Sequence, residues 1–96
     1  MITRYLVSYD IADPDRLRKV HGIMKTRGVH VQDSLYEALL NETERVQLEN
    51  KLRKVMNLKE DQVMFISFGA ATRTELPEIV TLGLPYEPRT RGSIVM

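Results

Sequence analysis

The residues best suited to chemistry lie near the start of the chain, where an acidic side chain follows an apolar segment. Asp10 ends the stretch YLVSYD, and hard cations such as Mg²⁺ and Mn²⁺ take carboxylate oxygens and waters, which leaves room for a phosphate. Asp10 is thus a candidate metal ligand, although an aspartate that caps the turn after a strand accounts for it as well. One carboxylate is few for a metal site, so a symmetric partner chain would have to supply a second Asp10.

Positive charge follows directly after Asp10. Residues 14–27 contain one acid, Asp15, against five basic residues: Arg16, Arg18, Lys19, Lys25 and Arg27. A solvated helix face has the same composition, but the second predicted helix is mixed in sign, so the excess is local and suits phosphate binding. Arginine binds phosphate oxygens through two parallel hydrogen bonds, whereas lysine acts as a point charge. The sequence therefore predicts nucleic-acid contacts by Arg16, Arg18, Lys19 and Arg27.

Further polar residues follow in the segment 29–40. Strand alternation places His30, Ser34 and Tyr36 on one side, where they either contact a phosphate backbone or are ordinary sheet residues. His21 falls on the apolar stripe of the first predicted helix, which favours a packed histidine over a base. The sequence has no cysteine and no glycine-rich phosphate loop, which argues against thiol chemistry and nucleotide-binding loops.

The element that must hold Asp10 is a short β-branched and aromatic segment, residues 2–9, which predicts a largely buried strand. Asp13 and Pro14 then begin a helix, as an N-cap acceptor and a proline in the first helical position. Gly28 is expected to end this helix. Its apolar positions recur at helical spacing and are Leu17, Val20, His21 and Met24.

The rest of the chain predicts further strands and a second helix. Residues 29–40 form either one long bent strand or two short strands broken at Asp33 and Ser34. Asn41 and Glu44 make a capping box at the start of the second helix. Additional strands are expected at residues 62–68, 78–83 and 93–96.

This order of elements predicts the fold class. Strand, helix, two strands, helix and strand is the βαββαβ pattern of an α+β, ferredoxin-like sandwich, here with extra strands at the C-terminal end. Residues 1–84 would form this domain, and residues 85–96 a C-terminal extension able to add a strand to a partner subunit. Two helices cover only one face of such a sheet, so an apolar second face needs a partner, and a homodimer is expected.

Composition narrows the function only a little. The chain has 96 residues, enough for one domain. Its 14 basic and 13 acidic residues leave a formal charge of +1, so the charge of the whole chain predicts no particular partner. The N-terminal apolar stretch is too short for a signal peptide or a membrane span, and no membrane partner is expected. The absence of cysteine fits the cytoplasm.

Three motifs resemble those of a known family. They are YDI-x-D at residues 9–13, an arginine-rich helix with KV at residues 19–20, and VQ-x-S-x-Y-E at residues 31–37. Together they are similar to the small CRISPR-associated (Cas) nuclease family, the second of the two proteins common to spacer acquisition. The resemblance covers roughly residues 3–83. The chain departs from the family pattern at Leu17, which separates two usually adjacent arginines, and at His30, where an arginine is often found.

The resemblance implies a function for these residues. Family members are ferredoxin-like homodimers, and by likeness Asp10 is the metal ligand and catalytic residue of a Mg²⁺- or Mn²⁺-dependent endonuclease acting on RNA or duplex DNA. Arg16 and Arg18 fall where the family carries helix arginines. The implied partner is the CRISPR integrase subunit. Two alternatives stay open: a non-catalytic DNA-binding scaffold for the integrase, and a toxin-like ribonuclease of the same fold.

Overall fold

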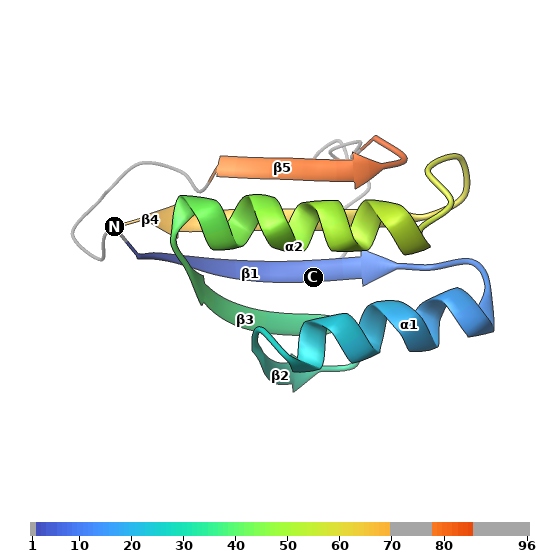
Figure 1. Ribbon diagram of the computed structural model, residues 1–96, viewed down its shortest axis with the longest axis horizontal. Helices are drawn as coiled ribbons and strands as arrows, with labels where there is room; N and C mark the ends of the chain where they lie inside the picture. Colours follow the sequence, from blue (N-terminus) through green and yellow to red (C-terminus); the bar gives the residue numbers. More distant parts are fainter. Residues whose placement is uncertain (1, 70–77, 86–96) are drawn as a thin grey trace, which may run out of the picture.

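The structure of the chain, a computed structural model, describes residues 2–69 and 78–85. Within these residues the elements are β1 (Thr3–Asp10), α1 (Pro14–Lys25), β2 (Val29–Gln32), β3 (Leu35–Leu40), α2 (Glu42–Val55), β4 (Gln62–Gly69) and β5 (Glu78–Gly83) (Figure 1). The expected closing strand at residues 93–96 lies outside the described residues. No helix in the described ranges is long and apolar enough to cross a membrane.

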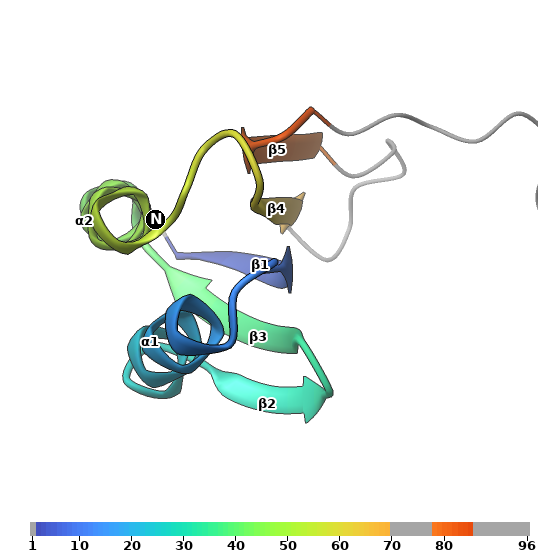
Figure 2. The same ribbon diagram turned by 90° about the vertical axis from the view of Figure 1, so that its right-hand side faces the viewer.

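The strands of the described chain form one antiparallel sheet in the order β2-β3-β1-β4-β5. Both helices lie on the same side of this sheet (Figure 2). The order β2-β3-β1-β4 with two helices on one face is the ferredoxin-like arrangement, so the predicted α+β class is confirmed. β5 extends the sheet beyond β4. Because β1 is paired on both sides, Asp10 lies at the end of a central, well-held strand.

Both helices begin where the sequence predicts their caps. The Oδ2 of Asp13 accepts a hydrogen bond from Arg16 N at 3.0 Å, and Pro14 occupies the first helical position. In α2, Glu44 N donates to Asn41 Oδ1 at 2.7 Å and Asn41 N donates to Glu44 Oε1 at 2.9 Å. These side chains satisfy N–H groups that have no partner in the first helical turn, so the predicted capping residues are confirmed.

The end of α1 differs from the prediction that Gly28 stops the helix. The last helical residue is Lys25, and the cap is Thr26, whose N–H bonds to carbonyls of the last turn. A Cβ on Gly28 would lie 2.7 Å from the carbonyl oxygen of Glu37 on β3. Glycine is needed here because the chain passes close to β3, and not because the helix requires a left-handed residue.

Residues 29–40 form a hairpin of two strands, which decides between the two arrangements that the sequence allows. The turn consists of Asp33 and Ser34, and Asp33 has a φ of 38°, a conformation that aspartate tolerates better than most residues. Tyr9 N donates to the Ser34 carbonyl at 3.1 Å. The hairpin turn is therefore held against the end of β1.

The core fills the space between the helices and the sheet face that they cover. Val7 and Tyr9 of β1 point into it and are 0% and 5% exposed, whereas Asp10 is exposed. Full burial of a large apolar side chain contributes about 1.5–3 kcal/mol. The buried hydrophobic residues are Val7, Tyr9, Val20, Met24, Tyr36, Ala38, Leu40, Leu48, Leu52, Met56, Val63, Phe65 and Leu82.

The other sheet face carries no further layer within the described chain (Figure 2). Apolar side chains on β1, β3, β4 and β5 lie on it, and six of them make up what we call the open-face patch: Leu6, Leu35, Leu39, Met64, Ile66 and Ile79. Leu6, Ile66 and Ile79 form one cross-strand row. Leu39 and Ile79 are 57% and 42% exposed. Arg4 and Glu37 lie on the same face, as an exposed ion pair at 3.9 Å beside Leu39 and Leu6. Apolar side chains on an uncovered sheet face are typical of an interaction surface.

Candidate functional site

Asp10 ends β1 with its side chain exposed on the open face. Alternation sets this direction, because Tyr9 before it points into the core. Gln62 is the residue opposite Asp10 on β4. The acidic side chains that form hydrogen bonds or ion pairs at this end of the described chain are Asp13, Asp15, Glu60 and Asp61, and Asp10 is not among them. The Asp10 carboxylate is thus free to bind a ligand, and it does not cap the turn that follows the strand.

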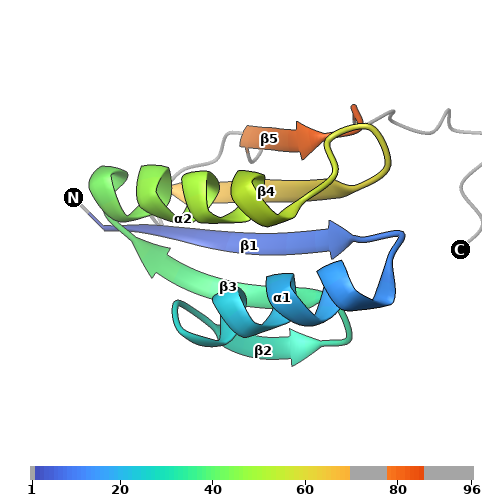
Figure 3. The same ribbon diagram turned by 45° about the vertical axis from the view of Figure 1, so that its right-hand side comes forward.

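Arg16 is engaged with other side chains of the protein. Its Nε donates to Asp61 Oδ2 at 2.9 Å, and its Nη2 donates to Asp61 Oδ1 at 3.3 Å and to Glu60 Oε1 at 3.0 Å. These bonds join the start of α1 to the loop between α2 and β4, which lies at the same end of the sheet as the end of β1 (Figure 3). Few donors of Arg16 remain for the phosphate contact that the sequence predicts.

Asp61 is a residue that sequence reasoning missed. Its side chain is fully buried, and besides Arg16 it accepts hydrogen bonds from the backbone N–H groups of Ala12 and Asn57, each at 2.9 Å. Burial opposes the charged form, but the hydrogen bonds from Arg16, Ala12 and Asn57 outweigh it and hold the pKa of Asp61 below its ordinary value. Asp61 is therefore ionised at neutral pH. An acid just before a strand resembles any turn residue, so the sequence carries no signal for it.

The other basic residues predicted to bind nucleic acid differ in their exposure and in their ion pairs. The side chain of Arg18 is 79% exposed and has only a long 3.4 Å contact with Asp15, and Lys19 is exposed. Arg27 lies beyond the end of α1, half-buried and 3.7 Å from Glu44. Ion pairs between exposed side chains contribute little, so the pair of Arg18 with Asp15 is easily exchanged for a phosphate. Arg18 and Lys19 are therefore the most available basic residues.

A shallow depression of about 340 Å³ lies beside the end of β1. Its lining residues are Tyr9, Pro14, Leu17, Arg18, His21, Asp33 and Ser34. The depression brings two of the predicted contact residues, Arg18 and Ser34, next to Tyr9, the neighbour of Asp10. These side chains therefore share one end of the sheet with Asp10, although Lys19 and Arg27 are not part of the lining.

His30 and Tyr36 lie together as alternation predicts, with ring centroids 5.0 Å apart. Tyr36 is 1% exposed, so its ring does not reach a nucleic acid at the surface. The hydroxyls of Tyr9 and Tyr36 lie 3.0 and 2.9 Å from Nδ1 of His21, which confirms His21 as a packed histidine. Burial, with a smaller effect of Tyr36, raises the pKa of Tyr9 to about 12, so this phenol stays protonated. His30 is exposed and donates from Nε2 to the Asp33 carbonyl at 2.7 Å.

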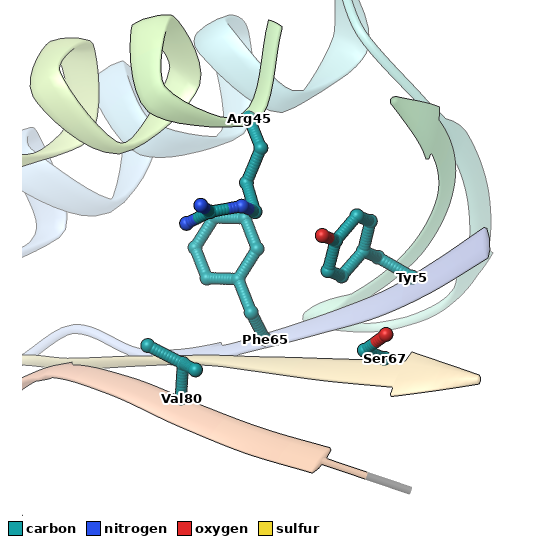
Figure 4. A pocket seen from close by; sticks show the side chains of 5 residues that line it. All are labelled: Tyr5, Arg45, Phe65, Ser67 and Val80. Atoms are coloured by element: carbon teal, nitrogen blue, oxygen red, sulfur yellow. The ribbon is translucent and has the colours of Figure 1, made fainter. Parts of the chain in front are cut away.

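A second pocket, of about 180 Å³, lies towards the start of β1. It is lined by Tyr5, Arg45, Phe65, Ser67 and Val80, with Arg45 reaching down from α2 (Figure 4). Arg45 is paired with Glu49. None of the lining residues is an acid, so this pocket lacks a carboxylate for metal chemistry. The candidate site is therefore the end of the sheet where Asp10 lies.

Metal-binding side chains do not cluster on one chain within the described residues. These residues contain no group of three or more His, Cys, Asp or Glu side chains placed to bind a metal ion. The carboxylate of Asp10 suits a hard cation such as Mg²⁺ or Mn²⁺, but the described residues do not surround it with two further metal-binding side chains. Within the described residues, one chain by itself therefore does not form a complete metal site.

Fold and site together define a class of protein: a small ferredoxin-like α+β protein whose central strand ends in a free carboxylate, on an uncovered apolar sheet face beside a basic helix. The family model described as CRISPR associated protein Cas2 matches residues 1–75. The chain belongs to this family, and the resemblance of its motifs is confirmed.

Relatives and solved structures agree with this assignment. A Rhodospirillum rubrum protein named CRISPR-associated endoribonuclease Cas2 1 is 32% identical over 92 residues, which are 96% of this chain and 89% of that protein. CRISPR-associated endoribonuclease Cas2 of Geobacter sulfurreducens is 26% identical over 96% of both chains. The crystal structure of the hypothetical protein TT1823 from Thermus thermophilus is similar with a TM-score of 0.68 at 30% identity, covering 81% of this chain and 100% of that one. A crystal structure of cas2 with 22% identity and a TM-score of 0.68 covers 100% and 98% and supports the fold.

Proposed function

We propose that this chain is the subunit of a homodimeric nuclease that hydrolyses a phosphodiester bond at Asp10 with Mg²⁺ or Mn²⁺, and that it works with the CRISPR integrase in spacer acquisition. The observation that carries the proposal is the Asp10 carboxylate, exposed at the end of the central strand while the neighbouring carboxylates are engaged. A free carboxylate on a rigid element is what a hard cation requires. The relatives named endoribonucleases support nuclease chemistry.

The position of Asp10 relative to the open-face patch supports a two-chain site. Leu6, Ser8 and Asp10 follow one another on the open side of β1, so the carboxylate lies at the rim of the apolar surface. Two chains that pack patch to patch about a two-fold axis would bring both Asp10 residues to one seam. The dimer would thereby supply two Asp10 carboxylates, where one chain supplies one.

The chain's own residues would bind and orient the substrate. Arg18 and Lys19 are exposed on α1 and can bind phosphates of the nucleic acid. Tyr9 remains protonated because its pKa is about 12, so it does not act as a base. A divalent cation, when bound, neutralises charge on the phosphate and makes a water molecule more acidic. Asp10 is the residue that would hold it.

Cleavage of labelled RNA and labelled duplex DNA by the purified protein tests this function. We expect cleavage of at least one substrate with Mg²⁺ or Mn²⁺ and its loss with EDTA. Binding of both nucleic acids without cleavage in either metal would reject the nuclease and favour a scaffold.

A non-catalytic scaffold is the second candidate, and one observation favours it. The described residues of one chain contain no cluster of metal-binding side chains. A scaffold would use the same dimer, with Arg18 and Lys19 holding a DNA duplex for the integrase. Spacer acquisition that continues in cells after cleavage has been lost would support this role.

The open-face patch should hold the dimer together. Ile66 lies in the middle of the patch, between Leu6 and Ile79, so Ile66→Arg is expected to place a charge in the interface and give a monomer. Sedimentation at micromolar concentration should show a dimer for the wild type and a monomer for this variant. Leu58→Arg is the control, because Leu58 is 49% exposed but lies between α2 and β4. A monomeric wild type would contradict the proposal.

Arg18 and Lys19 should bind phosphates. The double change of Arg18 and Lys19 to alanine is expected to weaken duplex binding and to reduce the slope of log K against log[salt] by about 1 for each lost phosphate contact. Fluorescence anisotropy at several salt concentrations measures both quantities. The change of Lys51 and Lys54 to alanine removes the same charge from α2 and serves as the control. Equal effects of the two pairs would show that only net charge matters.

A further inference from the structure

The buried carboxylate of Asp61 is bonded to the segment that follows Asp10. Ala12 N, two residues beyond Asp10, donates to Asp61 Oδ1 at 2.9 Å. Arg16, in the first turn of α1, donates to both oxygens of Asp61 at 2.9 and 3.3 Å. The carboxylate of Asp61 thus binds both the middle of the loop between β1 and α1 and the first turn of α1.

The segment around Asp61 also holds Asp10 from the side of the sheet. Gln62, the next residue after Asp61, is the β4 partner of Asp10. Asn57 N donates to Asp61 Oδ2 at 2.9 Å, and Leu84 N donates to the Asp61 carbonyl at 2.8 Å. Asp61 is therefore tied to the start of the α2–β4 loop and to the end of β5. Charge-assisted hydrogen bonds in a buried environment are strong and directional, which makes Asp61 a rigid anchor.

Asp10 depends on such an anchor because its own side chain is exposed and the neighbouring side-chain bonds do not include it. We propose that Asp61 and Arg16 are positioning residues for Asp10: their partly buried ion pair fixes the backbone that follows Asp10 and so directs its carboxylate. The inference rests on the proposed function of Asp10. A misplacement of about 1 Å at a reacting group can cost ~10²-fold in rate, so a small loosening of the loop is enough to matter.

The variant Arg16→Lys tests the pair, because lysine keeps the charge but offers one point donor in place of the planar fork. We expect kcat at saturating nucleic acid to fall at least about tenfold, while Kd and its salt slope stay at the wild-type values. A phosphate contact by Arg16 predicts the reverse, with weaker binding, a shallower salt slope and unchanged kcat. That result would overturn the inference. Asp61→Asn is expected to lower kcat in the same way, and its site is too buried to touch nucleic acid.

Loss of stability alone must be distinguished from loss of positioning. Glu49→Gln is the matched control, because Glu49 is 6% exposed and pairs with Arg45 and Arg53 on α2, without a contact to the loop after Asp10. Glu49→Gln should lower the stability and leave kcat unchanged at a temperature where every variant is folded. If Glu49→Gln lowered kcat as much as Arg16→Lys, the inference would be wrong.

A second readout does not require cleavage. Amide hydrogen exchange by NMR, in the protein without metal or nucleic acid, reports how firmly Ala12 is held. We expect exchange at Ala12 to become at least about tenfold faster in Arg16→Lys and Asp61→Asn, and to stay unchanged in Glu49→Gln. Unchanged exchange in the first two variants would overturn the positioning role. If the wild type does not cleave, the proposed nuclease fails, and the exchange rates still decide whether the pair holds the loop.

Discussion

Asp10→Asn is expected to reduce metal-stimulated cleavage by at least about 100-fold. Asparagine keeps the size of the side chain but lacks the negative charge that a hard cation prefers. Asp10 is exposed and makes none of the side-chain bonds found at its end of the described chain. The stability should therefore change by no more than about 0.5 kcal/mol. Single-turnover cleavage at several Mg²⁺ and Mn²⁺ concentrations measures the effect.

The control for this change is Glu42→Gln, which neutralises another exposed carboxylate at the start of α2 and should leave cleavage unchanged. Nucleic-acid affinity of Asp10→Asn should stay close to the wild-type value, because phosphate binding depends on Arg18 and Lys19. Undiminished cleavage by a folded Asp10→Asn protein would exclude Asp10 from catalysis. Spacer acquisition in cells that express this variant then separates the two functions, since a scaffold would still support it.

Asp61→Ala is expected to lower the free energy of unfolding by about 2–4 kcal/mol, because backbone N–H groups that lose their acceptor cost about 1–3 kcal/mol each when they are buried. The change leaves the guanidinium of Arg16 without its main acceptor and removes the acceptor of the Ala12 and Asn57 N–H groups. Domains of this size are stable by only about 5–15 kcal/mol, so the loss is a large fraction of the total. Urea denaturation followed by circular dichroism measures it.

The contribution of Asp61 should also depend on pH in a defined direction. Its pKa is lower in the folded chain than its ordinary value of 3.8, so the folded state binds the proton less readily than the unfolded state. The stabilisation is therefore fully present above pH 3.8 and is lost as the pH falls through the folded pKa. The stability difference between wild type and Asp61→Asn should be constant at neutral pH and shrink in acid. A difference that grows in acid would contradict this assignment.

Local signals in the sequence predicted most of the fold. Asp13 with Pro14 and Asn41 with Glu44 mark the starts of both helices, and the structure confirms both caps. These signals work because a cap bonds to an N–H group three residues away. The sequence also placed Asp10 at the end of the first strand, which the structure confirms. The order of elements then left the ferredoxin-like arrangement as the simplest way to bury the apolar faces.

Only the tertiary structure decided which charged residues are free and which are engaged. By sequence Arg16 and Arg18 are equivalent, yet Arg16 is bonded to Asp61, 45 positions away, while Arg18 stays exposed. Gly28 is a second residue whose role the sequence did not show. Glycine is required there because the backbone of Glu37 comes close, and not because the helix before it needs a glycine to end. Caps and alternation depend on neighbours within a few residues, whereas the partner of a buried charge is chosen by the packing of distant segments. Asp10 is therefore visible in the sequence, and the residues that hold it in place become visible only in the fold.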